Sequence, residues 1–155
     1  MTKKLEFALE SYTNVKKEIQ PLIEEHYKAI ALHQDVMKLN PDWKQYGKLD
    51  SIGALRVYTA RSEGKLVGYF VVVVSKSMHY QDHLFATNDV IYLAPSHRKG
   101  TAGIRLIKFA EEQVKAEGIT LLVINTKAHA AFDAILERSG FELTERVYSK
   151  CLKDK

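Results

Sequence analysis

The chain has 155 residues, of which 46% are hydrophobic and 27% are charged, and its formal net charge is +4 at pH 7. This balance predicts one globular α/β domain over residues 1–155 with a full apolar core, and it excludes a disordered or collagen-like chain. No apolar run is long enough to span a membrane, and the modest, scattered positive charge argues against nucleic acid as a partner.

The sequence contains a single cysteine, Cys151, and therefore cannot form an internal disulfide. This usage favours a reducing compartment, and we expect a cytoplasmic location. Cys151 has no histidine near it in the sequence, so we interpret it as a packed thiol and not as a nucleophile. His79 and His83 have the spacing of helical metal ligands, but no third ligand is evident and no metal site is predicted.

The first third of the chain predicts a strand and two helices. Leu5–Leu9 has the pattern of a short strand, and apolar residues then recur with a helical period over residues 14–32, where Asn14 suits the N-cap. Pro21 lies inside this pattern and predicts a kink or a split. Residues 40–43 (Asn-Pro-Asp-Trp) predict the start of a second, short helix. The apolar stripe of the long helix consists of Val15, Ile19, Leu22, Ile23, His26 and Ile30.

The middle of the chain predicts three strands. Ala54–Arg61 and Lys65–Ser75 flank Ser62-Glu-Gly64, and this arrangement is typical of a hairpin. Leu84–Ala94 predicts a further strand, which runs directly into a basic, glycine-containing loop.

The last third predicts a helix, a strand, a helix and a strand. The first of these helices ends at Gly118, and its inner face holds Gly103, Ile107, Ala110 and Val114. Leu121–Ile124 is wholly apolar, which predicts a strand covered on both faces. Ala128–Arg138 predicts a helix, and Phe141–Leu152 alternates as a final strand does.

The basic loop predicts an anion site. The first backbone N–H groups of a helix have no partner within the helix, and the helix dipole adds partial positive charge there. Gly100 and Gly103 allow the backbone to approach a ligand closely, and no acidic residue lies between Val90 and Ala110. The basic side chains are Arg98, Lys99, Arg105 and Lys108. We therefore expect a phosphate or pyrophosphate ligand.

Two familiar phosphate loops are excluded by the spacing. The Walker pattern places a lysine six residues after its first glycine, and the corresponding position here is Leu106. The dinucleotide fingerprint needs two glycines that lie two apart, whereas Gly100 and Gly103 lie three apart.

Residues 95–107 resemble the coenzyme A loop of the GNAT acetyltransferases. The pattern of that loop is Arg or Gln, two residues, Gly, one residue, then Gly or Ala. Arg98 matches the first position and Gly103 the last, while Thr101 replaces the middle glycine. Thr101 keeps its backbone N–H and adds a hydroxyl that can reach a phosphate.

An alternative register of the loop starts at His97, which keeps Gly100 and Ala102 but loses the leading Arg or Gln. The order of the predicted elements also resembles this family over nearly the whole chain. With His79 and Tyr80 ahead of the loop strand, the resemblance is closest to short phage and bacterial members.

The resemblance implies a fold and an activity. The expected fold is a mixed, mostly antiparallel sheet flanked by helices and splayed between the loop strand and the next strand. The expected activity is acetyl-CoA-dependent transfer of an acetyl group to a primary amine of a small molecule or a protein, and a homodimer is a further expectation. The alternative is a non-catalytic module that binds a coenzyme A thioester or another protein.

The resemblance also implies the cofactor contacts. The backbone around Tyr92 and Leu93 is expected to hold the pantetheine arm and to polarise the thioester carbonyl. Asn125 resembles the family's cofactor-facing asparagine, and its alternative role is that of a strand-end turn residue. The full set of expected cofactor contacts is Tyr92, Leu93, Arg98, Lys99, Gly100, Thr101, Ala102, Gly103, Ile104 and Asn125.

Amine acetylation requires a group that accepts a proton, because an amine of pKa about 10.4 must be neutral to attack. Asp89 in the loop strand is the candidate base. Strand alternation predicts that it shares a side with Ile91 and Leu93, and burial there would raise its pKa. The alternative is a carboxylate at a strand edge, or one paired with a core donor.

The leaving thiolate needs a proton source. Many family members carry a tyrosine in the last helix, and the matching residue here is Leu136. Tyr148 is therefore the catalytic candidate, with Tyr92 or solvent as alternatives, although both tyrosines also suit a purely structural place on an amphipathic strand.

The resemblance places four residues near the acceptor amine, namely Glu24, His26, His79 and Tyr80. The alternatives are a hydrogen-bonded core position for His26 and a solvated helix face for Glu24.

Overall fold

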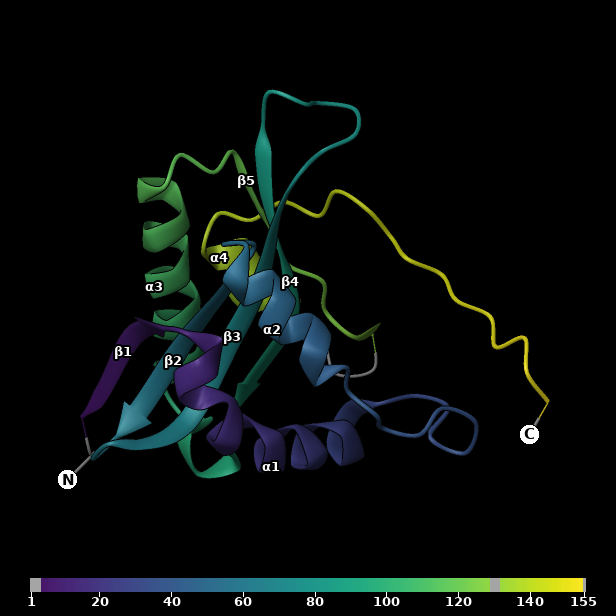
Figure 1. The fold of residues 1–155 in the computed structure, drawn as a ribbon. Helices are drawn as coiled ribbons and strands as arrows, with labels where there is room; N and C mark the ends of the chain where they lie inside the picture. Colours follow the sequence, from purple (N-terminus) through teal and green to yellow (C-terminus); the bar gives the residue numbers. More distant parts are fainter. Residues whose placement is uncertain (1–3, 129–131, 155) are drawn as a thin grey trace.

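The computed structural model describes residues 4–128 and 132–154, which form a five-stranded sheet with helices on both faces (Figure 1). The strands follow the chain order β1-β2-β3-β4-β5. Neighbours from β1 to β4 are antiparallel, and β5 is parallel to β4. The predicted mixed, mostly antiparallel sheet is confirmed. The strands are β1 (Leu5–Glu10), β2 (Leu55–Ser62), β3 (Lys65–Lys76), β4 (Leu84–Leu93) and β5 (Leu121–Val123).

Helices α1 (Tyr12–Ile30) and α2 (Trp43–Ser51) cover one face of the sheet, and α3 (Ala102–Ala116) covers the other (Figure 1). Each face has its own apolar cluster. The α3-side cluster includes Tyr58, Phe70, Val72, Ala86, Leu106 and Ala110. The α1-side cluster includes Tyr12, Val15, Ile19, Val57, Tyr69, Val71 and Tyr92. No helix in the described residues is long and apolar enough to cross a lipid bilayer.

Helix α1 differs from the prediction at its start and in its middle. Ser11, not Asn14, is the N-cap, because the Ser11 hydroxyl accepts a hydrogen bond from the Asn14 N–H at 3.3 Å. The predicted split at Pro21 is wrong, since α1 runs through it as one helix. A proline removes one helical hydrogen bond, and the full burial of Val15 and the burial of Ile19 hold the preceding turns on the sheet.

The C-terminal third differs most from the prediction. The expected final strand over Phe141–Leu152 is wrong, because this segment is extended but joins no sheet (Figure 1). β5 is consequently an edge strand, and Leu121 is 48% exposed instead of covered on both faces. Helix α4 spans Asp133–Arg138, and residues 129–131 of the predicted helix lie outside the described residues.

Gly68→Ala is expected to lower the free energy of unfolding by about 1–3 kcal/mol. A Cβ at position 68 would lie 2.7 Å from Cδ1 of Leu93 and 2.9 Å from the carbonyl oxygen of Tyr92. Strands β3 and β4 would therefore have to move apart, and urea denaturation measures the loss. Gly47→Ala in α2 is the matched control, because its added Cβ meets nothing within 4 Å. A Gly68→Ala variant as stable as the wild type contradicts this close approach.

Candidate active site

The candidate base sits on an irregularity of β4. Pairing between β3 and β4 joins Val72 to Asn88 and then Val71 to Val90, so Asp89 has no partner residue across the ladder. Such a β-bulge places an extra residue in one strand and changes the direction of its side chain. Bulges are frequent next to active sites for this reason.

The Asp89 carboxylate faces α2. Its Oδ2 accepts a hydrogen bond from the Tyr46 hydroxyl at 2.5 Å, and Tyr46 packs against the α1-side cluster that contains Val90. The expectation that Asp89 shares the side of Ile91 and Leu93 is therefore wrong, since those two residues pack on the α3 side. The bulge causes the difference. The side chain is also exposed, so the expected burial is wrong as well.

The Tyr46 hydroxyl is a permanent hydrogen-bond donor to the Asp89 carboxylate. Burial raises the pKa of the Tyr46 hydroxyl far above its ordinary value, and the hydrogen bond to Asp89 raises that pKa further. Tyr46 therefore stays protonated and directs its proton to the carboxylate. The sequence alone did not indicate Tyr46, whose only signal is its place in the short helix that begins at Trp43.

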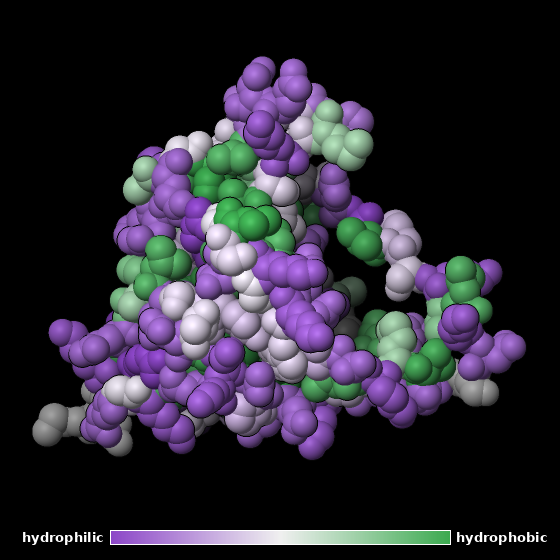
Figure 2. Space-filling model, in the orientation of Figure 1, coloured by the Kyte–Doolittle hydropathy of each residue, from purple (hydrophilic) through white to green (hydrophobic). Residues whose placement is uncertain are grey.

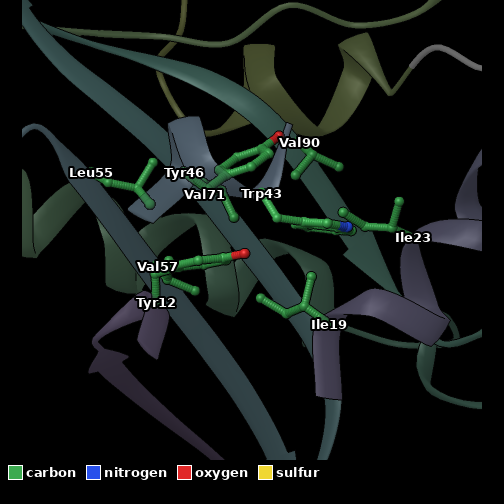
Figure 3. A pocket seen from close by; sticks show the side chains of 9 residues that line it. All are labelled: Tyr12, Ile19, Ile23, Trp43, Tyr46, Leu55, Val57, Val71 and Val90. Carbon is green, nitrogen blue, oxygen red and sulfur yellow. The ribbon is translucent and has the colours of Figure 1, made fainter. Parts of the chain in front are cut away.

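An apolar pocket lies beside this pair, between α1, α2 and the sheet (Figure 3). The Tyr46 ring forms part of its wall, and its hydroxyl extends past the wall to Asp89. The Tyr12 ring stacks on Tyr46 with a centroid distance of 5.7 Å. The lining residues are Tyr12, Ile19, Ile23, Trp43, Tyr46, Leu55, Val57, Val71 and Val90. The carboxylate thus stands at the edge of an aromatic surface.

Strands β4 and β5 separate next to Asp89. Their parallel pairing stops at Thr87 and Val123. Beyond that point the Asn88 side chain replaces the backbone ladder: its Oδ1 accepts from the Asn125 N–H at 2.7 Å, and its Nδ2 donates to the Asn125 carbonyl at 3.3 Å. The β5-facing edge of residues 89–93 therefore has no strand partner among the described residues. This splay was predicted, and Asn125 lies at it.

The loop after β4 leaves a set of free backbone donors. Gly100 has φ of +84°, a left-handed conformation that glycine adopts readily. The ladder of α3 begins with the Arg105 N–H donating to Thr101 at 2.9 Å. In the described part of the chain, the N–H groups of Ala102, Gly103 and Ile104 have no acceptor.

Charge around these donors is positive. The first turn of α3 contains no acidic residue, and Lys99 and Thr101 are exposed beside it. The Arg98 guanidinium lies 5.6 Å from the centroid of the Tyr92 ring, and its Nε donates to the Leu93 carbonyl at 2.7 Å. Free N–H groups, a helix N-terminus and unopposed cations together fit a pyrophosphate.

A second group of polar side chains surrounds Tyr92. Its ring is buried on the α1 side, where its hydroxyl donates to Oε2 of Glu25 at 2.8 Å. His26 lies 5.5 Å from Tyr92 between ring centroids. Burial lowers the pKa of His26, and the charges of Arg98 and Lys127 lower it further. His26 is therefore neutral near pH 7.

Two adjacent glutamates of α1 differ in their contacts. Glu24 is exposed and makes no hydrogen bond or ion pair within the described residues, whereas its neighbour Glu25 contacts Tyr92. A helix turns by about 100° per residue, so adjacent positions face different directions. The apolar stripe of α1 alone could not separate the two.

Three other candidates are not brought to this region. His79 and Tyr80 are exposed in the loop before β4, ~30 Å along that strand from the loop after it. Tyr148 is 87% exposed on the C-terminal segment. Leu136 is buried in α4 and supplies no acid. Among the described residues, no three His, Cys, Asp or Glu side chains are grouped to hold a metal ion.

Comparison with known proteins identifies the class. Residues 18–137 match the family model described as the acetyltransferase (GNAT) family, and the chain belongs to this family. Its members are N-acetyltransferases that use acetyl-CoA. No curated protein sequence matches the chain.

Solved structures share the fold at low identity. An aminoglycoside acetyltransferase from an uncultured soil metagenomic sample has a TM-score of 0.73 and 16% identity, over 96% of this chain and 97% of its own. Glucosamine-6-phosphate N-acetyltransferase from Arabidopsis thaliana has a TM-score of 0.73 and 13% identity, over 97% and 100%. A predicted acetyltransferase from Clostridium acetobutylicum, solved with acetyl-CoA, has a TM-score of 0.67 and 10% identity, over 96% and 97%.

Proposed function

We propose that the protein transfers the acetyl group of acetyl-CoA to a primary amine and that Asp89 accepts the amine proton. One observation carries this proposal: an exposed carboxylate, aimed by a bulge, stands beside the splay of β4 and β5. A carboxylate that is open to substrate and fixed by one donor is suited to accept a proton.

Acetyl-CoA supplies a thioester carbonyl that an amine can attack. We assign its pyrophosphate to the free N–H groups of residues 102–104 and to the Arg98 guanidinium. The unpaired edge of β4 offers N–H and C=O groups to an extended arm, as a neighbouring strand would use them. Asn88 and Asn125 close this slot at one end.

Asp89 is assigned as the group that accepts the proton of the attacking amine. Neither candidate tyrosine is available to protonate the leaving thiolate. The Tyr92 hydroxyl donates its proton to Glu25, and Tyr148 is exposed on the C-terminal segment. Burial raises the pKa of Tyr92, with a further contribution from Glu25. Solvent is therefore the proposed proton source for the thiolate.

The first test is a calorimetric titration with acetyl-CoA, followed by a thiol-release screen over amines. The screen should pair arylalkyl amines with amino-sugars and lysine peptides. Saturable binding together with amine-dependent thiol release supports the proposal. Binding without release from any amine favours a non-catalytic thioester-binding module, and absence of binding refutes both.

Gly103→Val is expected to weaken acetyl-CoA binding by at least about tenfold, equivalent to ~1.4 kcal/mol. Gly103 is in the first turn of α3, where an added Cβ meets nothing within 4 Å. The fold should therefore tolerate the side chain, while a ligand on the free N–H groups should not. Calorimetry measures the affinity, and Ala116→Val in the last turn of α3 is the control. Unchanged affinity places the phosphates elsewhere.

A further inference from the structure

A hollow of about 370 Å³ lies at one end of the sheet, where α1, the turn between β2 and β3 and the loop after β4 meet. This volume is within the range of small-molecule binding sites. The lining includes none of the residues assigned above to the base or to the pyrophosphate. Ala94 is the lining residue nearest to Asp89 along the chain, at a distance of roughly 16 Å for five extended residues. The hollow is therefore separate from the candidate base.

The walls of the hollow are tied to one another. The Arg61 guanidinium donates from Nη1 and Nη2 to the Glu18 carboxylate of α1, each at 2.8 Å, and from Nη1 to the Gly64 carbonyl at 2.9 Å. These contacts join the β2–β3 turn to α1. The Ala94 N–H donates to the Val67 carbonyl at 2.7 Å, which joins the loop after β4 to β3. The shape of the hollow is thus set before a ligand arrives, and such preorganisation lowers the cost of binding.

Two hydrogen-bonding groups of the lining have capacity to spare. Oε2 of Glu25 accepts from the Tyr92 hydroxyl at 2.8 Å, and the Glu25 carboxylate forms no ion pair with the described residues. Its Oε1 is therefore available to a ligand. Ser62 is only 7% exposed, and its hydroxyl makes no hydrogen bond with the described residues. A buried hydroxyl without a partner is uncommon and points to a missing one.

The chemistry of the lining favours a cation with an apolar body. Glu25 and Glu63 are opposed by one lysine, Lys65, whose side chain is exposed and can extend into water. In the view of Figure 2 the surface over α1 is mostly hydrophilic, which favours a small ligand over an apolar protein partner at this helix. The apolar part of the lining consists of Leu22, Leu66, Val67 and Ala94.

We propose that this hollow binds a small organic cation with a short apolar body, such as an alkylguanidinium. The Glu25 carboxylate accepts N–H groups of the cation, the Ser62 hydroxyl accepts another, and the alkyl chain covers the apolar part of the lining. A planar guanidinium suits these acceptors because it presents several donors in fixed directions. The proposal does not depend on the acetyltransferase assignment.

The test is an NMR titration of the ¹⁵N-labelled full chain with n-butylguanidinium. The amides of residues 62–67 and 96–97 are expected to shift and to saturate. The matched ligand is n-butylurea, which has nearly the same shape but no charge, and it should bind much more weakly. Equal binding of n-butylurea, shifts confined to other segments, or the absence of saturable shifts overturns the proposal.

Two variants identify the carboxylate. Glu25→Gln keeps the size of the side chain and can still accept from the Tyr92 hydroxyl, but it loses the charge. It should weaken n-butylguanidinium binding at least about tenfold. Glu24→Gln removes the neighbouring exposed carboxylate, which does not line the hollow, and should leave the affinity unchanged. Circular dichroism verifies that each variant is folded. An unchanged affinity in Glu25→Gln, or an equal loss in both variants, shows that Glu25 does not hold the cation and overturns the proposal.

Discussion

Asp89→Asn is expected to lower turnover by about 10²–10⁴-fold, the usual effect of losing a general base. The amide keeps the size of the carboxylate and can still accept the Tyr46 hydrogen bond, but it cannot take a proton from the amine. The affinity for acetyl-CoA should be nearly unchanged, because the proposed phosphate contacts lie in the loop after Leu93 and in α3. Steady-state kinetics on an acceptor found in the amine screen, together with calorimetry, separate the two quantities.

Two further variants sharpen this test. Tyr46→Phe removes the donor but leaves the carboxylate, so its effect on turnover should be much smaller than that of Asp89→Asn. Asp82→Asn changes an exposed carboxylate in the loop before β4 and should leave turnover unchanged. If Asp89→Asn turns over at the wild-type rate, the base is elsewhere, and neutral His26 becomes the candidate to examine.

Arg98→Ala is expected to weaken acetyl-CoA binding by about 1.5–3 kcal/mol, the value of a charge-assisted hydrogen bond. This corresponds to roughly 10–150-fold in Kd. Nε of Arg98 is already bonded to the Leu93 carbonyl, which leaves the other guanidinium nitrogens for an anion. The guanidinium is thus held at the end of β4 before any ligand arrives. Calorimetric titration of the variant with acetyl-CoA measures the loss.

The control for this result is Lys108→Ala, which removes an exposed positive charge from the same basic stretch in the second turn of α3. Its effect should be small and should disappear as salt is added, because exposed charges that are not in contact are screened. An Arg98→Ala variant that binds acetyl-CoA as tightly as Lys108→Ala does would remove Arg98 from the site.

The order of the elements was predictable because it depends on local signals. The continuous apolar run within Lys65–Ser75, the hairpin glycine Gly64 and the helical period after the basic loop each act over a few residues. The geometry of the loop after β4 was predictable for the same reason, since helix donors, glycines and cations are contiguous in the chain, while its binding of an anion stays a prediction. Pro21 was misjudged because packing of Val15 and Ile19 on the sheet outweighs a local propensity.

The partners of the site could not be predicted in this way. Tyr46 and Asp89 are 43 residues apart, and nothing local in either segment indicates the other. Asn88, which joins β4 to Asn125, had one signal that went unused: a polar Thr-Asn-Asp run inside an otherwise apolar strand. The C-terminal segment was assigned to the sheet because alternation identifies a strand but does not identify the strand it pairs with.

The bulge at Asp89 also sets the phase of the second half of β4. Before it, the even-numbered Ala86 faces α3, whereas after it the odd-numbered Ile91 and Leu93 face α3. The extra residue thus moves the even-numbered side chains from the α3 side to the α1 side, and for this reason the even-numbered Tyr92 points to the α1 side. Substitutions at position 89 leave this parity intact. A chain lacking that residue would pair regularly with β3 and keep Tyr92 on the α1 side, but it would have no carboxylate beside the splay of β4 and β5.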